Sequence, residues 1–148
     1  ALGSGQASRL HWALVHPGIA EEAWLGHDEE DQAGAFAGML VCEPERVQEA
    51  LDLYRAELAR AQAEGLTADE VTRAQRRFGS GLVLQAETPL SRLVHVGFDW
   101  VYRRQVTPVA ELIAEIQAVT VDDCNRLLAE RPFEALSIVC VGPIGELH

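Results

Sequence analysis

The chain has 148 residues, of which 48% are hydrophobic, and its formal net charge is −11. This length suffices for one domain with a sizeable core, and the composition is that of a globular chain and not of a disordered one. The acidic balance argues against nucleic acid and anionic membrane surfaces as partners, because both attract cations. No apolar run approaches the roughly 20 residues needed to cross a bilayer.

The cysteines argue against a redox or zinc-knuckle site. Cys42, Cys124 and Cys140 are widely spaced, and no C-x-x-C pair occurs. We therefore expect buried, reduced thiols in a cytoplasmic protein, with the periplasm as the alternative if a leader has been removed.

The first half of the chain predicts a helix, a hairpin and a second helix. The first helix covers residues 6–15 and ends at "HPG", because proline disfavours helix in the residue before it. Two apolar segments around the acidic "DEEDQ" predict an antiparallel hairpin over residues 19–42. The second helix covers residues 44–64 and ends at Gly65. Its apolar stripe comprises Val47, Leu51, Tyr54 and Leu58.

The second half predicts further helices and one strand. The helices cover residues 68–87, 89–104, 108–117 and 120–131. Thr67 and Glu70 form a capping box at the start of the first, and Thr120 with Asp123 repeats the pattern. The face of the first helix predicted to point inward comprises Val71, Ala74, Phe78 and Leu82. The closing "LSIVCV" predicts a buried strand over residues 136–141.

This element order predicts the α+β class. We expect one two-layer domain over residues 1–148, with a mostly antiparallel sheet and a block of helices on one face. About three strands are visible in the pattern, too few to cover so many amphipathic helices. The sequence therefore predicts a truncated domain that lacks strands, and its bare sheet edge and exposed helix faces predict self-association.

Several segments resemble one family in the same order and at nearly the same spacing. "LGSGQASRL" resembles the L-G-G-G-x-x-S-R-L signature of the pitrilysin/insulinase zinc metallopeptidases, the group that contains mitochondrial processing peptidase. "AGAFAGMLVCEPERVQEAL", "AEGLTADEVTRAQRRFGSGLVLQAETPLSRL", "IQAVTVDD" and "SIVCVGP" resemble later elements of that family. The resemblance implies a processing-peptidase-like (LuxS-type) metallohydrolase half-domain.

In this family, catalysis uses H-x-x-E-H, whose histidines bind zinc and whose Glu activates water. No such motif begins at any histidine of the chain: His11, His16, His27, His95 and His148. We therefore expect no catalytic residue and no metal site here, with zinc in the catalytic domain of the parent or of a partner. His27 beside four acidic residues could be an improvised metal site, but a solvated hairpin tip is the better interpretation.

The resemblance also indicates which substrate contacts are present. The family's non-catalytic domain places an Arg and a Tyr near the zinc, and these positions fall at Val15 and Glu21, which do not match. The glycine-rich loop that handles substrate in processing peptidases corresponds to Gly3, Ser4 and Gly5. The alternative is that these three residues only connect a strand to a helix.

These features are compatible with three functions. The first is the C-terminal part of the second, non-catalytic domain of a bacterial-type zinc peptidase, which binds peptide substrate and pairs with an N-terminal catalytic domain or partner subunit. The second is an enzymatically silent scaffold or partner subunit of the same family. An independent small-molecule-binding α+β domain is the third and least favoured.

Overall fold

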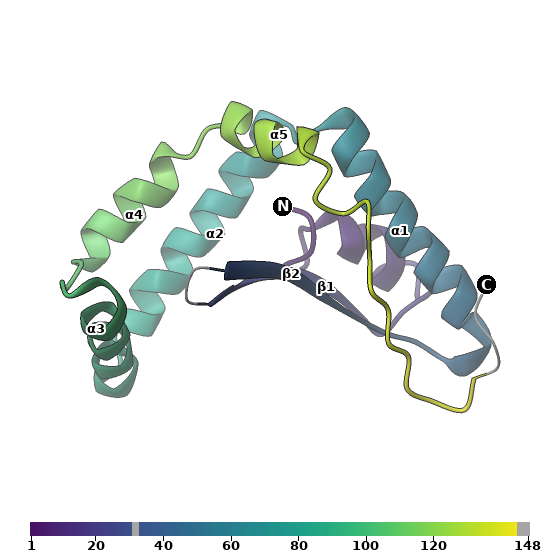
Figure 1. The fold of residues 1–148 in the computed structure, drawn as a ribbon, viewed down its shortest axis with the longest axis horizontal. Coiled ribbons are helices and arrows are strands. Elements are labelled where there is room, and N and C mark those ends of the chain that lie inside the picture. The colour runs from purple at the N-terminus through teal and green to yellow at the C-terminus, as the bar shows by residue number, and fades with distance from the viewer. Residues whose placement is uncertain (31–32, 145–148) are drawn as a thin grey trace. The chain divides into compact units, whose positions relative to one another are not determined.

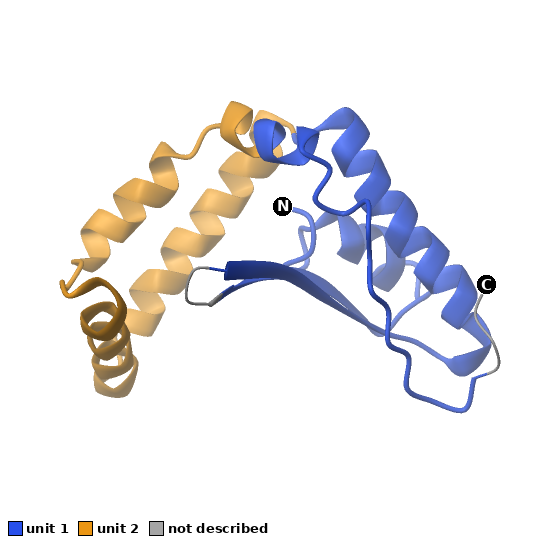
Figure 2. Cartoon of the chain, in the orientation of Figure 1, with its two compact units in different colours: residues 1–66, 125–148 blue, residues 67–124 orange. Residues whose placement is uncertain are grey.

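The computed structural model describes residues 1–30 and 33–144, and its fold is α+β, as predicted (Figure 1). The elements in chain order are η1 (His11–Val15), β1 (Glu22–Glu30), β2 (Ala33–Val41), η2 (Pro44–Arg46), α1 (Val47–Glu64), α2 (Ala68–Ala86), α3 (Pro89–Arg103), α4 (Val109–Ala118) and α5 (Val121–Ala129). The chain forms two compact units (Figure 2). Unit 1 comprises Ala1–Leu66 with Asn125–His148, and unit 2 comprises Thr67–Cys124.

The sheet of unit 1 is one antiparallel hairpin within the described residues. Its register runs from Glu22 opposite Val41 to Glu30 opposite Ala33. The acidic Asp28 and Glu29, which the sequence predicted to lie in the turn, continue β1 instead. The remaining residues of the predicted turn, 31–32, lie outside the described residues.

The first helix is shorter than its sequence predicted. Residues 6 and 7 form a turn, and η1 is a five-residue π-helix whose His16 N–H donates to the His11 carbonyl at 2.8 Å. The buried Ser8 hydroxyl accepts from the His11 N–H at 3.3 Å. The helical residues therefore begin after Ser8, and residues 3–8 form bends and a turn.

The core of unit 1 lies between the hairpin, η1 and α1. Its buried members are Leu10, Leu14, Ala20, Ala50, Tyr54, Leu58, Leu128 and Phe133. Leu14 and Leu58 are 0% and 2% exposed. The apolar stripe predicted for the second helix supplies Tyr54 and Leu58 to this core, which confirms that face of the helix.

The end of α1 is fixed by a contact between segments far apart in the sequence. Gly65 ends the helix at a φ of 76°, in the left-handed region where glycine is favoured. The Asn125 side chain then bonds both backbone groups of Leu66: its Oδ1 accepts from the N–H at 2.6 Å, and its Nδ2 donates to the carbonyl at 3.2 Å. Asn125 thus joins α5 to Leu66, just beyond the glycine that ends α1.

Unit 2 is helical within the residues that the structure describes. The Thr67–Glu70 capping box that the sequence predicted is present at the start of α2. The Gln75 side chain donates to the Ile116, Gln117 and Val119 carbonyls at the end of α4, which ties α2 to α4. Phe78, predicted to face inward, is 52% exposed, so the prediction is wrong for this residue.

A buried carboxylate holds the loop between α3 and α4. Asp99 Oδ2 accepts from the Thr107 backbone N–H at 2.5 Å, and Arg103 lies 3.9 Å away. The hydrogen bond from the Thr107 N–H is the largest cause that holds the pKa of Asp99 below its ordinary value; burial opposes it, and the charges of Arg103 and His95 lower the pKa further. The ionised form of Asp99 is therefore the form that stabilises the fold.

We expect the Asp99 contribution to stability to depend on acid pH. Because the pKa is lower in the folded state, this contribution is present above the unfolded value near 3.8 and is lost as pH falls through the folded value. Between pH 7 and pH 3, the melting midpoint of Asp99→Asn should therefore fall less than the melting midpoint of the unchanged chain. Equal losses in both proteins would contradict this role of Asp99.

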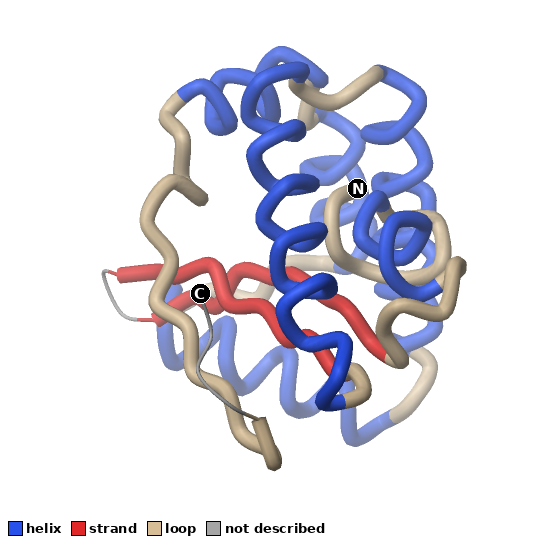
Figure 3. Tube along the Cα trace, turned by 90° about the vertical axis from the view of Figure 1, so that its right-hand side faces the viewer, coloured by secondary structure: helices blue, strands red, loops and turns tan. Residues whose placement is uncertain are grey.

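The strand predicted for residues 136–141 is not formed. The segment is extended without strand pairing, and it is drawn as a loop in Figure 3. Val139 and Val141 are 89% and 97% exposed, so the prediction of a buried strand is corrected. The physical reason is that a strand needs a partner edge, and the ladder of the described sheet contains only β1 and β2.

Candidate functional site

The candidate substrate loop is built from Gly3, Ser4 and Gly5, and its three residues lie in different environments. Gly3 is buried, whereas Ser4 and Gly5 are exposed. The Gly3 carbonyl accepts from the Leu25 N–H of β1 at 3.0 Å. A Cβ at Gly3 would overlap the backbone nitrogen and Cβ of Leu25. Gly3 therefore has a structural reason to be glycine, namely the close approach of the loop to β1.

The exposed part of this loop presents backbone donors to solvent. Gly5 has a φ of 79°, and its carbonyl accepts from the Ser8 N–H at 3.1 Å. In the described part of the chain, the backbone N–H groups of residues 4–7 have no hydrogen-bond partner. Exposed N–H groups of this kind can donate to the carbonyl or carboxylate oxygens of a bound peptide.

Arg9, in the segment that follows the candidate loop, donates to a backbone carbonyl. Its Nη2 lies 2.7 Å from the Gly65 oxygen at the end of α1. The guanidinium therefore caps the carboxyl end of that helix, where a cation is favourable. Arg9 therefore holds the segment that follows the candidate loop against the end of α1.

The two positions that depart from the family pattern lie at the ends of elements. Val15 is the last residue of η1, and Glu21 precedes β1 with its N–H donating to the Val41 carbonyl at 2.8 Å. Glu21 is exposed and Val15 is half-buried. Neither side chain can donate a hydrogen bond to an oxyanion at neutral pH, so neither position supplies the stabilising group that peptide hydrolysis needs.

The residues present do not fit a zinc ion. Among residues 1–30 and 33–144, no group of three or more His, Cys, Asp or Glu side chains could hold a metal. The His27 ring packs edge-on against Phe36, with ring centroids 5.1 Å apart. His148 lies outside the described residues. In the same ranges, no helix is both long and apolar enough to span a bilayer.

The cysteines are free, but they are less buried than the sequence predicted. Cys42 and Cys124 are half-buried, and Cys140 is exposed. Burial is the largest cause that raises the pKa of the Cys42 and Cys124 thiols. Burial and acidic neighbours therefore keep these two thiols protonated, which makes them weak nucleophiles.

Helix α3 carries an apolar face that sequence reasoning did not identify as a site. Six side chains that are 48–71% exposed make up this face, which we call the α3 face: Leu90, Leu93, Val94, Phe98, Val101 and Tyr102. They recur at spacings of three and four, so one stripe of the helix is apolar and faces solvent in this structure. The Phe98 and Tyr102 rings are stacked, with centroids 5.9 Å apart. The helical spacing was visible in the sequence, but its exposure was not.

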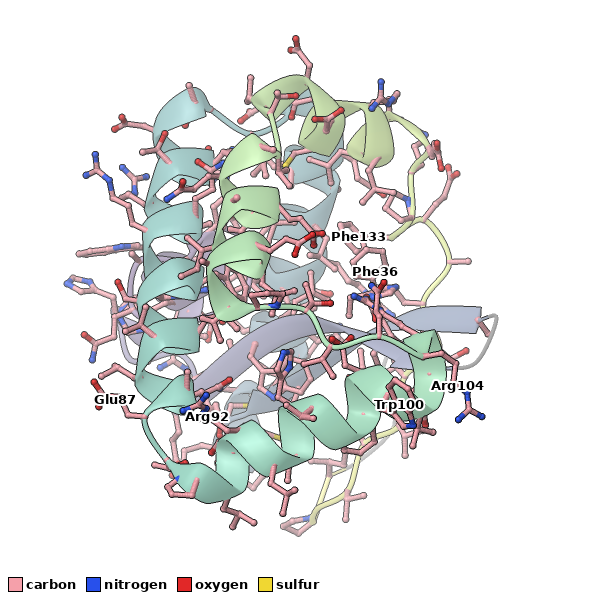
Figure 4. The ribbon with its side chains drawn as sticks, turned by 90° about the vertical axis from the view of Figure 1, so that its left-hand side faces the viewer. Phe36, Glu87, Arg92, Trp100, Arg104 and Phe133 are labelled. Carbon is pink, nitrogen blue, oxygen red and sulfur yellow. The ribbon has the colours of Figure 1, made fainter. Side chains whose placement is uncertain are left out.

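Polar and aromatic groups border the α3 face. Figure 4 shows Arg92 near the amino end of α3, and Trp100 and Arg104 near its carboxyl end. Trp100 is 55% exposed, as is typical of an interface aromatic. An exposed apolar stripe with a polar border is typical of a surface that binds another protein surface.

Comparison with known proteins agrees with this architecture. The solved inactive peptidase domain of a proposed zinc protease from Bordetella parapertussis matches at a TM-score of 0.69 with 18% identity, over 87% of this chain and 70% of that one. A protease from Helicobacter pylori matches at a TM-score of 0.71 with 19% identity, over 87% of this chain and 32% of that one. These two likenesses show the fold.

A curated relative and a family model complete the comparison. An uncharacterised zinc protease of Streptomyces coelicolor is 27% identical over 145 residues, which are 97% of this chain and 32% of the relative. The chain thus spans about a third of the length of that relative. The model of the family described as the peptidase M16 inactive domain matches residues 1–78, more than half of the chain. The chain therefore belongs to the peptidase M16 inactive-domain family.

Proposed function

We propose that the chain is the C-terminal part of the non-catalytic half of a zinc peptidase. In this role it pairs with a catalytic domain and forms one wall of the chamber that holds the peptide. The α3 face is the observation that carries the pairing, since it leaves six large apolar side chains in water. The zinc and the catalytic groups belong to the other half, because the described residues offer no ligand set for the metal.

Burying the α3 face against a partner would be favourable in free energy. Burying apolar surface stabilises a complex by about 25 cal/mol per Å², and large aromatic and aliphatic side chains dominate such contacts. The α3 face combines Phe98 and Tyr102 with aliphatic residues on one stripe. A catalytic domain is the partner that fits, since the curated zinc protease related to this chain is about three times as long as the matched region.

Peptide binding is the second part of the proposal. The exposed Ser4 and Gly5 supply free backbone donors, and Gly3 holds their loop against β1. Backbone donors recognise the main chain of a peptide without selecting its side chains, which suits a chamber that accepts varied sequences. We place this protein in the cytoplasm, where free thiols such as the exposed Cys140 persist.

A silent scaffold subunit of the same family is the alternative function. Val15 and Glu21 favour it, because neither can donate a hydrogen bond to substrate near the zinc. The α3 face is compatible with both roles, since a scaffold also pairs with a catalytic subunit. The two roles differ in whether the assembled protein hydrolyses peptide.

The proposal is tested in the protein encoded by the complete reading frame that contains this chain. We expect Leu93→Asp to separate the non-catalytic half from the catalytic one in limited proteolysis and to abolish zinc-dependent cleavage of an unstructured peptide. Leu127→Asp is the matched control, because Leu127 is 47% exposed on α5 and lies outside the α3 face.

The outcomes separate the two roles. The scaffold role would be selected by two results together. Leu93→Asp would disrupt pairing, and the unchanged protein would not hydrolyse peptide even after zinc is added. Pairing and cleavage that both survive Leu93→Asp would refute the role of the α3 face.

A further inference from the structure

Unit 2 contains a cavity whose lining residues are not those of the α3 face. Its volume is about 160 Å³, and its lining comes from α2, α3, α4 and the loop before α4. Most of the lining is apolar: Leu82, Ala86, Val96, Val106, Val109 and Leu112. An apolar cavity of about 150 Å³ can hold benzene, so this one has room for one aromatic ring or one branched aliphatic group.

Part of the cavity lining is open to solvent. Val96 and Val106 are 39% and 51% exposed, and Arg92 and Pro108 are also exposed. A ligand can therefore reach the cavity while the three helices stay folded.

The lining contains a cation and the positive end of a helix. No hydrogen bond or ion pair of the Arg92 guanidinium is present within the described residues, and Figure 4 shows Glu87 pointing away from Arg92. Helix α4 begins beside the cavity at Val109, without a side-chain cap. In the same described ranges, the N–H groups of Val109 and Ala110 have no hydrogen-bond partner. Uncapped N–H groups at a helix start favour an anion.

A buried hydroxyl without a partner lies in the same lining. Thr107 is 6% exposed, and its Oγ1 has no hydrogen-bond partner among the residues that the structure describes. The backbone of Thr107 is already engaged, since its N–H donates to Asp99 and its carbonyl lies 3.4 Å from the His95 Nε2. Buried polar groups are normally hydrogen-bonded, so the free hydroxyl points to a ligand that accepts from it.

No acidic side chain competes for these donors among the described residues that line the cavity. The Asp99 carboxylate, which is not part of the lining, accepts from the Thr107 N–H and lies 3.9 Å from Arg103. Its charge is thus compensated within the fold. The cavity is therefore suited to an anion although the chain carries a net charge of −11.

We propose that this cavity binds an apolar group that carries a carboxylate. The aliphatic or aromatic part fills the apolar lining, and the carboxylate accepts hydrogen bonds from Arg92, from the Thr107 hydroxyl and from the first N–H groups of α4. A planar guanidinium matches the two oxygens of a carboxylate. One guanidinium in a mainly apolar lining balances a single negative charge, which favours a carboxylate over a doubly charged phosphate.

Two sources offer this chemistry, namely a free short-chain carboxylic acid and the C-terminal residue of a peptide. The inference goes beyond the proposed peptidase role, because binding at this cavity requires neither zinc nor cleavage. Its test therefore measures binding alone, and an absence of peptide hydrolysis would leave the result unaffected.

The first measurement compares 4-methylpentanoate with 4-methylpentanamide, which has the same shape without the charge. The protein is the one encoded by the complete reading frame that contains this chain, and the signals are the NMR shifts of the Val96, Val109 and Leu112 methyl groups. We expect saturable shifts with the acid and at least about tenfold weaker binding of the amide. Equal affinities, or titrations that leave these three residues unchanged, would overturn the proposal.

Arg92→Gln tests the cation. We expect at least about tenfold weaker binding of 4-methylpentanoate and unchanged binding of the amide. Arg104→Gln is the matched control, because Arg104 is an exposed arginine at the other end of α3 and does not line the cavity. Unchanged affinity in Arg92→Gln, or an equal loss in Arg104→Gln, would overturn the proposal.

Thr107→Val separates a ligand contact from a structural role. The hydroxyl has no internal partner, so we expect the melting midpoint to stay the same or to rise. The affinity for 4-methylpentanoate should fall at least about fivefold, because one donor to the carboxylate is lost. Unchanged affinity would overturn the assignment of Thr107 to the site.

A further probe distinguishes the two sources of the carboxylate. An N-acetylated pentapeptide that ends in leucine with a free carboxylate is titrated beside 4-methylpentanoate. Tighter binding of the peptide would support the proposal with a peptide C-terminus as the ligand. Tighter binding of 4-methylpentanoate would support it with a small carboxylic acid as the ligand.

Discussion

Gly3→Ala is expected to destabilise the 148-residue chain by about 1–3 kcal/mol, the usual cost of forcing an extra carbon into a packed site. The added Cβ would overlap the Leu25 backbone nitrogen, so the loop would have to move away from β1. This movement would also break the 3.0 Å hydrogen bond from the Leu25 N–H to the Gly3 carbonyl. Urea denaturation followed by circular dichroism measures the loss.

Ser4→Ala and Gly5→Ala are the controls for this prediction. Ser4 is exposed, so its substitution should leave stability almost unchanged. Gly5 has a φ of 79°, and a side chain there costs about 1 kcal/mol in backbone strain. If Gly3→Ala left stability unchanged but weakened peptide binding, Gly3 would belong to the substrate contact and not to the connection between loop and strand.

The features that the sequence predicted well are set by local interactions. The Thr67–Glu70 capping box needs only residues three apart on one helix, and it is present as predicted. The α+β class follows from helical and strand periodicities, which are also local. Tyr54 and Leu58 reach the core because a helical stripe faces its nearest sheet.

The features that the sequence did not predict depend on distant segments. The pattern of residues 136–141 indicates a strand, but pairing requires an edge that the described sheet does not offer. Likewise, the periodicity of α2 marks Phe78 as part of an apolar face without showing that half of this side chain is exposed. Arg9 donates to the Gly65 carbonyl, 56 residues away, and no local rule predicts this contact. Periodicity identifies an apolar face, whereas its burial depends on what the fold places against it.

Strand β2 contains Gly34 and Gly38, and the surroundings of Gly38 show why a glycine is needed there. Gly38 lies opposite Leu25, and a Cβ at this position would overlap the Tyr54 hydroxyl. That hydroxyl donates to the Trp24 carbonyl at 2.9 Å. Burial raises the pKa of Tyr54 to about 12, so the phenol stays neutral and remains a donor at neutral pH.

Gly38→Ala is expected to cost about 1–3 kcal/mol, because its Cβ displaces the Tyr54 hydroxyl and breaks the hydrogen bond to Trp24. Tyr54→Phe removes the same bond and should cost about 1 kcal/mol. In the double variant the hydroxyl is gone and the new methyl group has more room, although the ring Cζ still lies 3.2 Å from it. We therefore expect the double variant to lose at least about 1 kcal/mol less than the sum of the two single losses.

Gly81→Ala serves as the control, since a Cβ there meets no atom within 4 Å and α2 gains about 0.5–1 kcal/mol from replacing glycine. Strictly additive losses for Gly38→Ala and Tyr54→Phe in urea denaturation would contradict the steric account. Additivity would mean that the space beside Gly38 does not matter and that its backbone freedom alone explains the glycine. A coupling of the expected sign would show that β2 carries glycine there to admit a side chain of α1, which a reading of strand propensity alone would miss.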